Sequence, residues 1–94
     1  MRKRKPKPEK ISVVLTPQDI ADLDDYAFLD SAYFSAGVVE KDGNTRFAWS
    51  PEELEDIVGY AAAAANHSSS RKLEKRLDAL YEKLNDALES YELD

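Results

Sequence analysis

The longest regular pattern in the sequence is an amphipathic stretch that begins at Arg71 and runs almost to the C-terminus. Its apolar residues recur at alternating gaps of four and three, which is the spacing of one face of an α-helix. They are Leu73, Leu77, Leu80, Leu84, Ala87 and Tyr91, and Tyr81 and Leu88 widen the same face. We call this set the C-terminal seam. A helix of roughly 20 residues is about 30 Å long, so the rest of the chain, or a second copy of it, must cover a long apolar face.

Few other residues are available to cover this apolar face, because the chain has only 94 residues, and it has no cysteine. This length is enough for one domain, and disulfides cannot reinforce its small core. The hydrophobic fraction of 43% is typical of a globular protein. We therefore expect one small domain over residues 11–94.

A short strand and a helix are predicted at the start of this domain. Residues 11–15 alternate apolar and polar side chains, as a half-buried strand does. Thr16 suits a helix N-cap, and Pro17 suits the first helical position. The residues expected on the buried face of the helix are Ile20, Leu23 and Ala27, and those expected on its exposed face are Asp19, Asp22 and Asp25. Residues 28–36 fit a helix or a loop equally well.

A β-hairpin is predicted next, because Asp42-Gly43 lies between two β-prone runs. An Asp-Gly pair is typical of two-residue hairpin turns, whose central residues need positive φ. With this turn Val38 faces Phe47, so Val38, Phe47 and Trp49 would share the buried face of the hairpin.

A second helix begins at Ser50-Pro51, where Ser50 and Glu53 form the pattern of a capping box. The residues expected on its buried face are Leu54, Ile57, Val58, Ala61, Ala62 and Ala65. The sequence thus predicts an α+β fold that is mainly helical. A short strand and a β-hairpin would pack against two to three helices, the last of them long and amphipathic.

Charge is divided sharply between the two parts of the chain. Residues 1–10 carry six basic side chains and one acidic one, a net charge of +5, whereas residues 11–94 carry seven basic and eighteen acidic ones, a net charge of −11. We expect residues 1–10 to be a disordered basic tail, because like charges repel and its two prolines disfavour helix and strand. Such a tail could serve solubility, dock onto an acidic surface of this protein or another, or contact nucleic-acid phosphates. The residues expected to contact phosphates are Arg2, Lys3, Arg4 and Lys5.

No residue pattern predicts catalysis, a cofactor or a metal ion. His67 is the only histidine, and it lies with three serines in a linker, where a nucleophile and its base are rarely positioned. The acidic cluster lacks the Gly and the closing Glu of a calcium loop, and it consists of Asp19, Asp22, Asp24, Asp25 and Asp30. We therefore expect no catalytic, cofactor-binding or metal-binding residues, and no enzyme activity.

Six aromatic residues between positions 26 and 49 are expected to form the core rather than a base-stacking surface, because the domain is small and acidic. They are Tyr26, Phe28, Tyr33, Phe34, Phe47 and Trp49. No apolar stretch approaches the roughly 20 residues of a membrane-spanning helix. No apolar segment follows the basic start, as one would in a signal peptide. We therefore expect a cytoplasmic protein that does not associate with membranes.

The predicted C-terminal helix is charged in the direction that opposes its own dipole. Its start is basic, with Arg71, Lys72, Lys75 and Arg76, and its end is acidic, with Asp86, Glu89, Glu92 and Asp94. Two arrangements would satisfy this gradient. The basic start could lie against the acidic first helix of the same chain, or two copies of the helix could pair antiparallel.

These observations favour a non-enzymatic protein-interaction or adaptor domain, which binds a protein partner or forms a homodimer through the C-terminal helix. The residues expected at that surface are Arg71, Lys72, Lys75, Arg76, Leu73, Leu77, Leu80, Tyr81, Leu84 and Leu88. The alternative is a nucleic-acid-associated accessory protein that contacts phosphates through its basic N-terminal tail. The acidic domain makes nucleic-acid binding elsewhere on the chain unfavourable.

Overall fold

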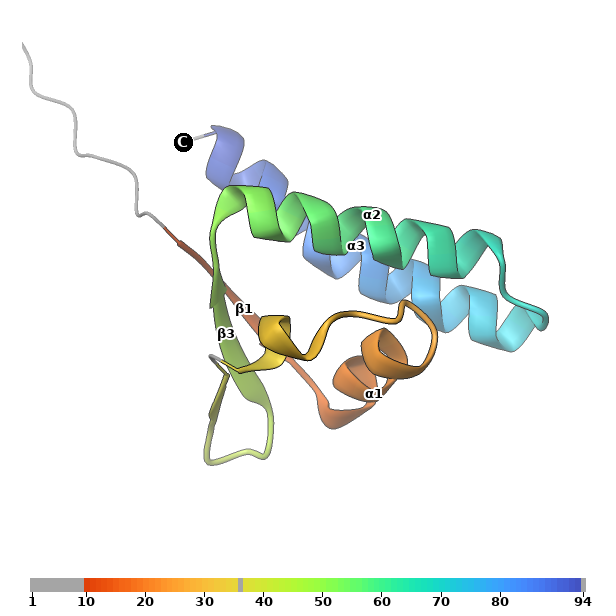
Figure 1. The fold of residues 1–94 in the computed structure, drawn as a ribbon, viewed down its shortest axis with the longest axis horizontal. Helices are drawn as coiled ribbons and strands as arrows, with labels where there is room; N and C mark the ends of the chain where they lie inside the picture. Colours follow the sequence, from red (N-terminus) through yellow and green to blue (C-terminus); the bar gives the residue numbers. More distant parts are fainter. Residues whose placement is uncertain (1–9, 36, 94) are drawn as a thin grey trace, which may run out of the picture.

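The computed structural model describes residues 10–35 and 37–93, so the predicted disordered tail lies, apart from Lys10, outside the described residues. In chain order the elements are β1 (Ile11–Leu15), α1 (Pro17–Asp25), the 3₁₀ helix η1 (Ser31–Phe34), β2 (Val38–Val39), β3 (Thr45–Trp49), α2 (Pro51–Asn66) and α3 (Arg71–Leu93) (Figure 1). The predicted α+β class is confirmed, with a three-stranded antiparallel sheet and three α-helices that end in a long C-terminal one.

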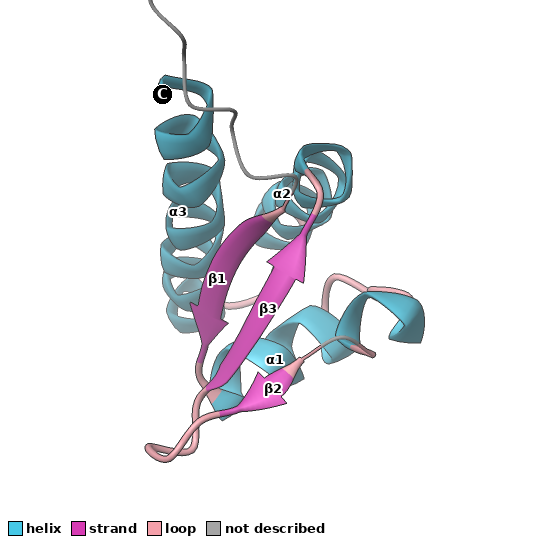
Figure 2. Ribbon diagram, turned by 90° about the vertical axis from the view of Figure 1, so that its left-hand side faces the viewer, coloured by secondary structure: helices cyan, strands magenta, loops and turns pink. Residues whose placement is uncertain are grey.

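The sheet has the order β1-β3-β2, so β3 is its central strand. β1 pairs with β3 over its whole length, from Ile11 opposite Trp49 to Leu15 opposite Thr45. Buried and exposed side chains alternate along β1, as its period of two predicts. The helices lie on one side of the sheet, and its opposite face is open (Figure 2). All the apolar faces of the elements therefore meet in one layer between sheet and helices.

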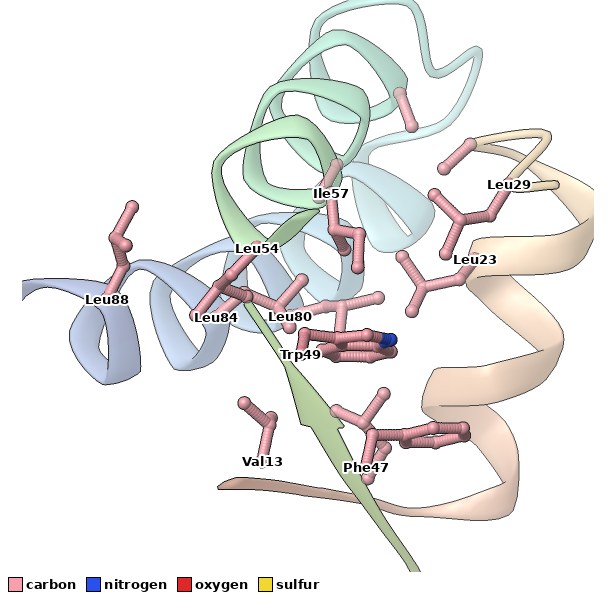
Figure 3. Packing of buried hydrophobic residues seen from close by; sticks show 14 of the residues in the cluster. Val13, Leu23, Leu29, Phe47, Trp49, Leu54, Ile57, Leu80, Leu84 and Leu88 are labelled. Atoms are coloured by element: carbon pink, nitrogen blue, oxygen red, sulfur yellow. The ribbon is translucent and has the colours of Figure 1, made fainter. Parts of the chain in front are cut away.

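That layer is built around two stacked aromatic rings. The rings of Phe47 and Trp49 have centroids 4.8 Å apart and planes within 6° of parallel. Around them lie Leu23 from α1, Leu54 from α2 and Leu80 from α3 (Figure 3). One strand thus supplies the pair of large side chains that all three helices cover.

The helix starts predicted from the sequence are confirmed. Thr16 Oγ1 accepts a hydrogen bond from the Asp19 amide at 3.1 Å, and Asp19 Oδ2 accepts one from the Thr16 amide at 3.0 Å. Ser50 and Glu53 form the same reciprocal pair at the start of α2. Ser70 Oγ accepts from the amide three residues later and caps α3.

The predicted register of the hairpin is wrong by one residue. Val38 lies opposite Arg46 rather than Phe47, and its side chain is 65% exposed. Because side chains alternate between the two faces of a strand, a slip of one residue moves Val38 from the buried face to the open one. Phe47 and Trp49 are buried, as predicted.

The reason is a three-residue loop in place of the predicted two-residue turn. The Gly43 amide donates to the Glu40 carbonyl at 3.0 Å, and the Glu40 amide donates to the Asn44 carbonyl at 2.7 Å. Gly43 has φ +89°, a conformation that glycine adopts without a steric penalty. This is the loop in which a turn is followed by one left-handed residue, and the extra residue shifts the pairing.

The prediction that Asp22 is exposed is also wrong. Its side chain is 1% exposed, and its two oxygens receive Nε and Nη2 of Arg76 at 2.8 and 2.9 Å. Gln18 Nε2 donates to the same carboxylate at 3.0 Å. A second ion pair joins Lys83 to Asp19 at 2.6 Å. Of the four basic residues at the start of α3, Arg76 therefore lies against the acidic first helix of the same chain, and Lys83 from the middle of α3 adds a second contact. The first of the two predicted arrangements thus holds for Arg76, whereas Arg71, Lys72 and Lys75 are exposed.

We predict that Trp49→Ala lowers the free energy of unfolding by about 3–5 kcal/mol, the usual cost of removing a buried Trp or Phe side chain. Trp49 is 2% exposed, and its Nε1 donates to the Tyr33 carbonyl at 2.8 Å. Urea unfolding followed by circular dichroism measures the change. Trp49→Phe keeps most of the packing and should cost clearly less, so equal losses for the two variants would contradict the packing explanation.

A second prediction concerns the pair that joins α1 to α3. Arg76→Gln should lower the urea midpoint, because the buried carboxylate of Asp22 loses its bidentate partner. Lys75→Gln is the matched control, since Lys75 is exposed and makes no ion pair with any described residue. The loss should be the same at every protein concentration, whereas a role for Arg76 in a dimer would make the loss depend on concentration.

Candidate functional site

The residues predicted to form an interaction surface divide into a buried and an exposed group. Leu77, Leu80, Leu84 and Leu88 lie in the core of the same chain, and Leu73 and Tyr81 pack against it partly buried. Arg76 holds Asp22, as described above. The three remaining basic residues, Arg71, Lys72 and Lys75, are exposed at the start of α3. The predicted phosphate contacts Arg2, Lys3, Arg4 and Lys5 lie outside the described residues.

A groove of about 820 Å³ is lined by residues of three segments: the chain from the end of α1 into η1, the second half of α2 with the connection that follows it, and the start of α3. Its lining contains four tyrosine or phenylalanine rings together with the polar residues Asp30, His67, Ser68 and Ser69. The lining residues are Tyr26, Ala27, Phe28, Asp30, Tyr33, Tyr60, Ala63, Ala64, His67, Ser68, Ser69 and Leu73. We call it the aromatic groove. No lysine or arginine of the described chain is among its lining residues.

Two side chains of the groove contradict the prediction that the aromatic cluster is core. Phe28 is 82% exposed and Tyr26 is 41% exposed. Tyr60, which the sequence pattern did not single out, is 48% exposed and faces them from α2. The spacing of these aromatic residues is irregular, so it does not show which of them are buried and which are exposed. The prediction that they form the core therefore depended on composition alone.

The backbone at Phe28 explains why its ring points outward. Ala27 and Leu29 on either side are buried, and the Leu29 amide donates to the Leu23 carbonyl at 3.2 Å, which turns the chain back after α1. Phe28 itself has φ +55°, in the left-handed region that costs a residue with a side chain about 1–2 kcal/mol. The chain therefore accepts strain at a position where it displays a large apolar ring to solvent.

Tyr33 joins the groove to an acidic part of α2. Its hydroxyl donates to Asp56 Oδ2 at 3.4 Å, while its carbonyl accepts from the indole of Trp49 in the core. Burial raises the pKa of the Tyr33 hydroxyl, and the neighbouring Asp56, Tyr60 and Glu53 raise it further. The Tyr33 hydroxyl therefore lies beside the acidic side chains of α2.

The same acidic part of α2 receives the end of the described N-terminus. The Ser50 amide and hydroxyl lower the pKa of Glu53, and the positive charge of Lys10 contributes to that lowering. Glu53, Asp56, Tyr60, Ala63 and His67 follow one another at gaps of three and four, so they form one stripe along α2. This stripe leads from Lys10 to the aromatic groove, and we call it the α2 stripe.

Two polar side chains that line the groove cap the ends of helices. Ser68 Oγ donates to the Ala65 carbonyl at 3.0 Å and so completes the end of α2. Asp30 Oδ1 accepts from the Ala32 amide at 3.0 Å and caps η1. His67 is exposed at the C-cap of α2. Asp30 and Ser68 thus terminate helices, while the exposed His67 adds an imidazole to the aromatic lining.

Across residues 10–35 and 37–93, no group of three His, Asp or Glu side chains is placed to hold a metal ion. None of the described helices combines the length and the apolar composition that crossing a bilayer requires. The sequence matches no protein-family model, and comparison with curated proteins and with solved structures gives no significant match.

We predict that Phe28→Gly does not destabilise the fold and raises its free energy of unfolding slightly, by about 0.5–1 kcal/mol. Glycine at this positive φ removes about 1–2 kcal/mol of backbone strain from the folded state. Its greater conformational entropy in the unfolded state lowers the free energy of unfolding by about 0.4–1 kcal/mol, which offsets part of the gain. The exposed ring contributes little to the core. Urea unfolding measures the change, with Leu29→Gly as the contrasting variant because Leu29 is buried. A clear loss of stability in Phe28→Gly would show that the ring supports the fold.

Proposed function

We propose that this domain is a non-enzymatic protein-interaction module that binds a segment of a partner protein in the aromatic groove. The observation that carries the proposal is the display of Phe28 at the edge of the groove by a strained backbone. Strain of this kind is retained where a function offsets it. A residue that served only the fold would be expected to avoid both the strain and the exposure.

The composition of the groove supports the same proposal. Tyrosine side chains are enriched among the residues that dominate binding energy at protein interfaces, since each combines a large apolar ring with a polar tip. Tyr26, Tyr33 and Tyr60 provide three such side chains around one hollow. Its volume of about 820 Å³ is large enough for several side chains of a partner segment. Tyr33 is also fixed to the core through Trp49, so part of the site is preorganised.

Self-association through the C-terminal helix is the weaker proposal. Four leucines of the C-terminal seam, Leu77, Leu80, Leu84 and Leu88, are buried within the chain, so they offer a second copy no contact surface unless the domain opens. The charge gradient is also partly accounted for, because Arg76 and Lys83 pair with α1 of the same chain. A homodimer that leaves the domain closed would therefore need other residues of α3.

Selection of random peptides for binding to the full chain tests the proposal. We predict that the selected peptides bind Phe28→Ala and Tyr60→Ala about 30-fold more weakly, which corresponds to about 2 kcal/mol for a side chain at the centre of an interface. Val39→Ala is the matched control, because Val39 is an equally exposed apolar residue away from the groove. Isothermal titration calorimetry measures the affinities, and nuclear magnetic resonance (NMR) spectra confirm that each variant is folded.

Two results would contradict this proposal. If the peptides bind all three variants equally, the groove is not the binding site. If the chain instead binds random duplex DNA with an affinity that falls steeply with salt and is lost when Arg2, Lys3, Arg4 and Lys5 become glutamine, the alternative function through the basic tail is supported.

A further inference from the structure

The groove and the N-terminal sequence of the chain are complementary in charge. Residues 2–9 carry five basic side chains and one acidic one, a net charge of +4. The described lining of the groove contains Asp30 and no lysine or arginine, and Glu53 and Asp56 lie along the α2 stripe that leads to it. The exposed Arg71, Lys72 and Lys75 lie at the start of α3, near the lining residue Leu73, so the negative charge is concentrated along the α2 stripe. A cationic segment is therefore the ligand class that the α2 stripe favours.

The aromatic rings favour the same ligand class. A Lys or Arg side chain over the face of a Tyr or Phe ring gains about 0.5–1 kcal/mol at an exposed site. Phe28, Tyr33 and Tyr60 provide such rings, and the carboxylate of Asp56 lies within hydrogen-bonding distance of the Tyr33 hydroxyl. Each basic side chain that enters the groove would thus meet a ring and a nearby negative charge.

The position of Lys10 indicates which cationic segment lies nearest. Lys10 is the first described residue, and its charge acts on Glu53 at the start of the α2 stripe. The stripe runs from Glu53 to His67, about 21 Å at 1.5 Å per helical residue. The eight residues before Lys10 reach about 27 Å when extended. Pro6 and Pro8 favour an extended conformation, so the segment is long enough to follow the whole stripe.

We propose that residues 2–9 bind in the same chain along the α2 stripe and place their basic side chains in the aromatic groove. This inference uses the site of the proposed function and adds that the free chain occupies that site itself. The segment is covalently attached, which gives it an effective concentration near 1 mM, so even weak contacts hold it in place for much of the time. A partner segment must then displace it.

A spin label tests the position of the segment directly. The chain has no cysteine, so Lys3→Cys provides a single attachment point for a nitroxide. In NMR spectra of the full chain, we expect the amide signals of Tyr60, Ala63 and His67 to broaden, and those of the hairpin loop 41–44 to stay sharp. Broadening should decrease at high salt, because part of the attraction is screened.

Matched variants and a mixing experiment make the outcome decisive. Asp56→Asn should reduce the broadening, whereas Glu82→Gln, an equally exposed acid on α3, should not. A mixing experiment separates contacts within one chain from contacts between two copies. Chains that carry the spin label but no isotope are mixed with isotope-labelled chains that carry no spin label. Only the second kind is observed, and its signals should show no broadening. Sharp signals along α2 in the first experiment would overturn the inference, and broadening in the mixture would assign the segment to a second copy instead.

Peptide binding separates this inference from the proposed function. If the segment occupies the groove for half to nine-tenths of the time, replacing Arg2, Lys3, Arg4 and Lys5 with glutamine should tighten binding of the selected peptides by about 2- to 10-fold. Unchanged affinity together with sharp α2 signals would leave the groove as a partner site and refute its occupation by residues 2–9. Loss of peptide binding in Tyr60→Ala bears only on the proposed function.

Discussion

The bidentate pair between Arg76 and Asp22 holds together parts of the chain that are 54 residues apart. A carboxylate that is 1% exposed is unfavourable without a partner, so the position of α1 depends on the guanidinium that α3 provides. The hydrogen bond to Asp22 raises the pKa of Arg76, and the neighbouring Tyr26 raises it further. The pair therefore lies at the point where α1 ends and the wall of the groove begins. Both the closure of the core and the shape of the groove depend on it.

Apart from Tyr60, Ala63 and Ala64 in α2, the groove is built from the ends of elements and the connections between them. Tyr26 and Phe28 follow α1, Tyr33 lies in η1, and His67 caps α2. Backbone groups at such ends have no partner within the helix, and here the side chains of Asp30 and Ser68 satisfy two of them. These two polar side chains are thus used by the fold, while the rings of Tyr26, Phe28 and Tyr60 stay exposed.

Local signals in the sequence predicted most of the fold because each depended on neighbours along the chain. The caps at Thr16 and Ser50 and the periodicity of the C-terminal seam are of this kind, and all were confirmed. The two errors have different causes. Asp22 has the pattern of a solvent-exposed acid, and only Arg76, 54 residues away, explains its burial. Val38 depends on a local choice, because hairpin loops of two and of three residues both suit Asp42-Gly43 and differ in register by one residue.

The groove could not be predicted from the sequence. Neither the backbone strain at Phe28 nor the exposure of the aromatic rings follows from a regular spacing of apolar residues. The signal available in the sequence was a dense run of aromatics after α1, with alanine and leucine next to Phe28. Small domains usually bury such residues, and only the turn that returns Leu29 to the core shows that Phe28 is directed outward. Tyr60 gave no signal at all, since one tyrosine beside an alanine run is common on helix surfaces.

The alanine run of α2 has a consequence for how this protein can change over evolutionary time. Ala61, Ala64 and Ala65 are buried towards the core, while Ala63 is exposed beside Tyr60 along the α2 stripe. Ala63 and Ala64 line the groove, and Ala64 also belongs to the core, so this part of the groove wall consists of methyl groups that have no side-chain rotamers. A larger side chain at Ala64 would disturb the core as well as the groove. Substitutions at the exposed Phe28 and Tyr60 can instead alter the groove while the core packing stays intact.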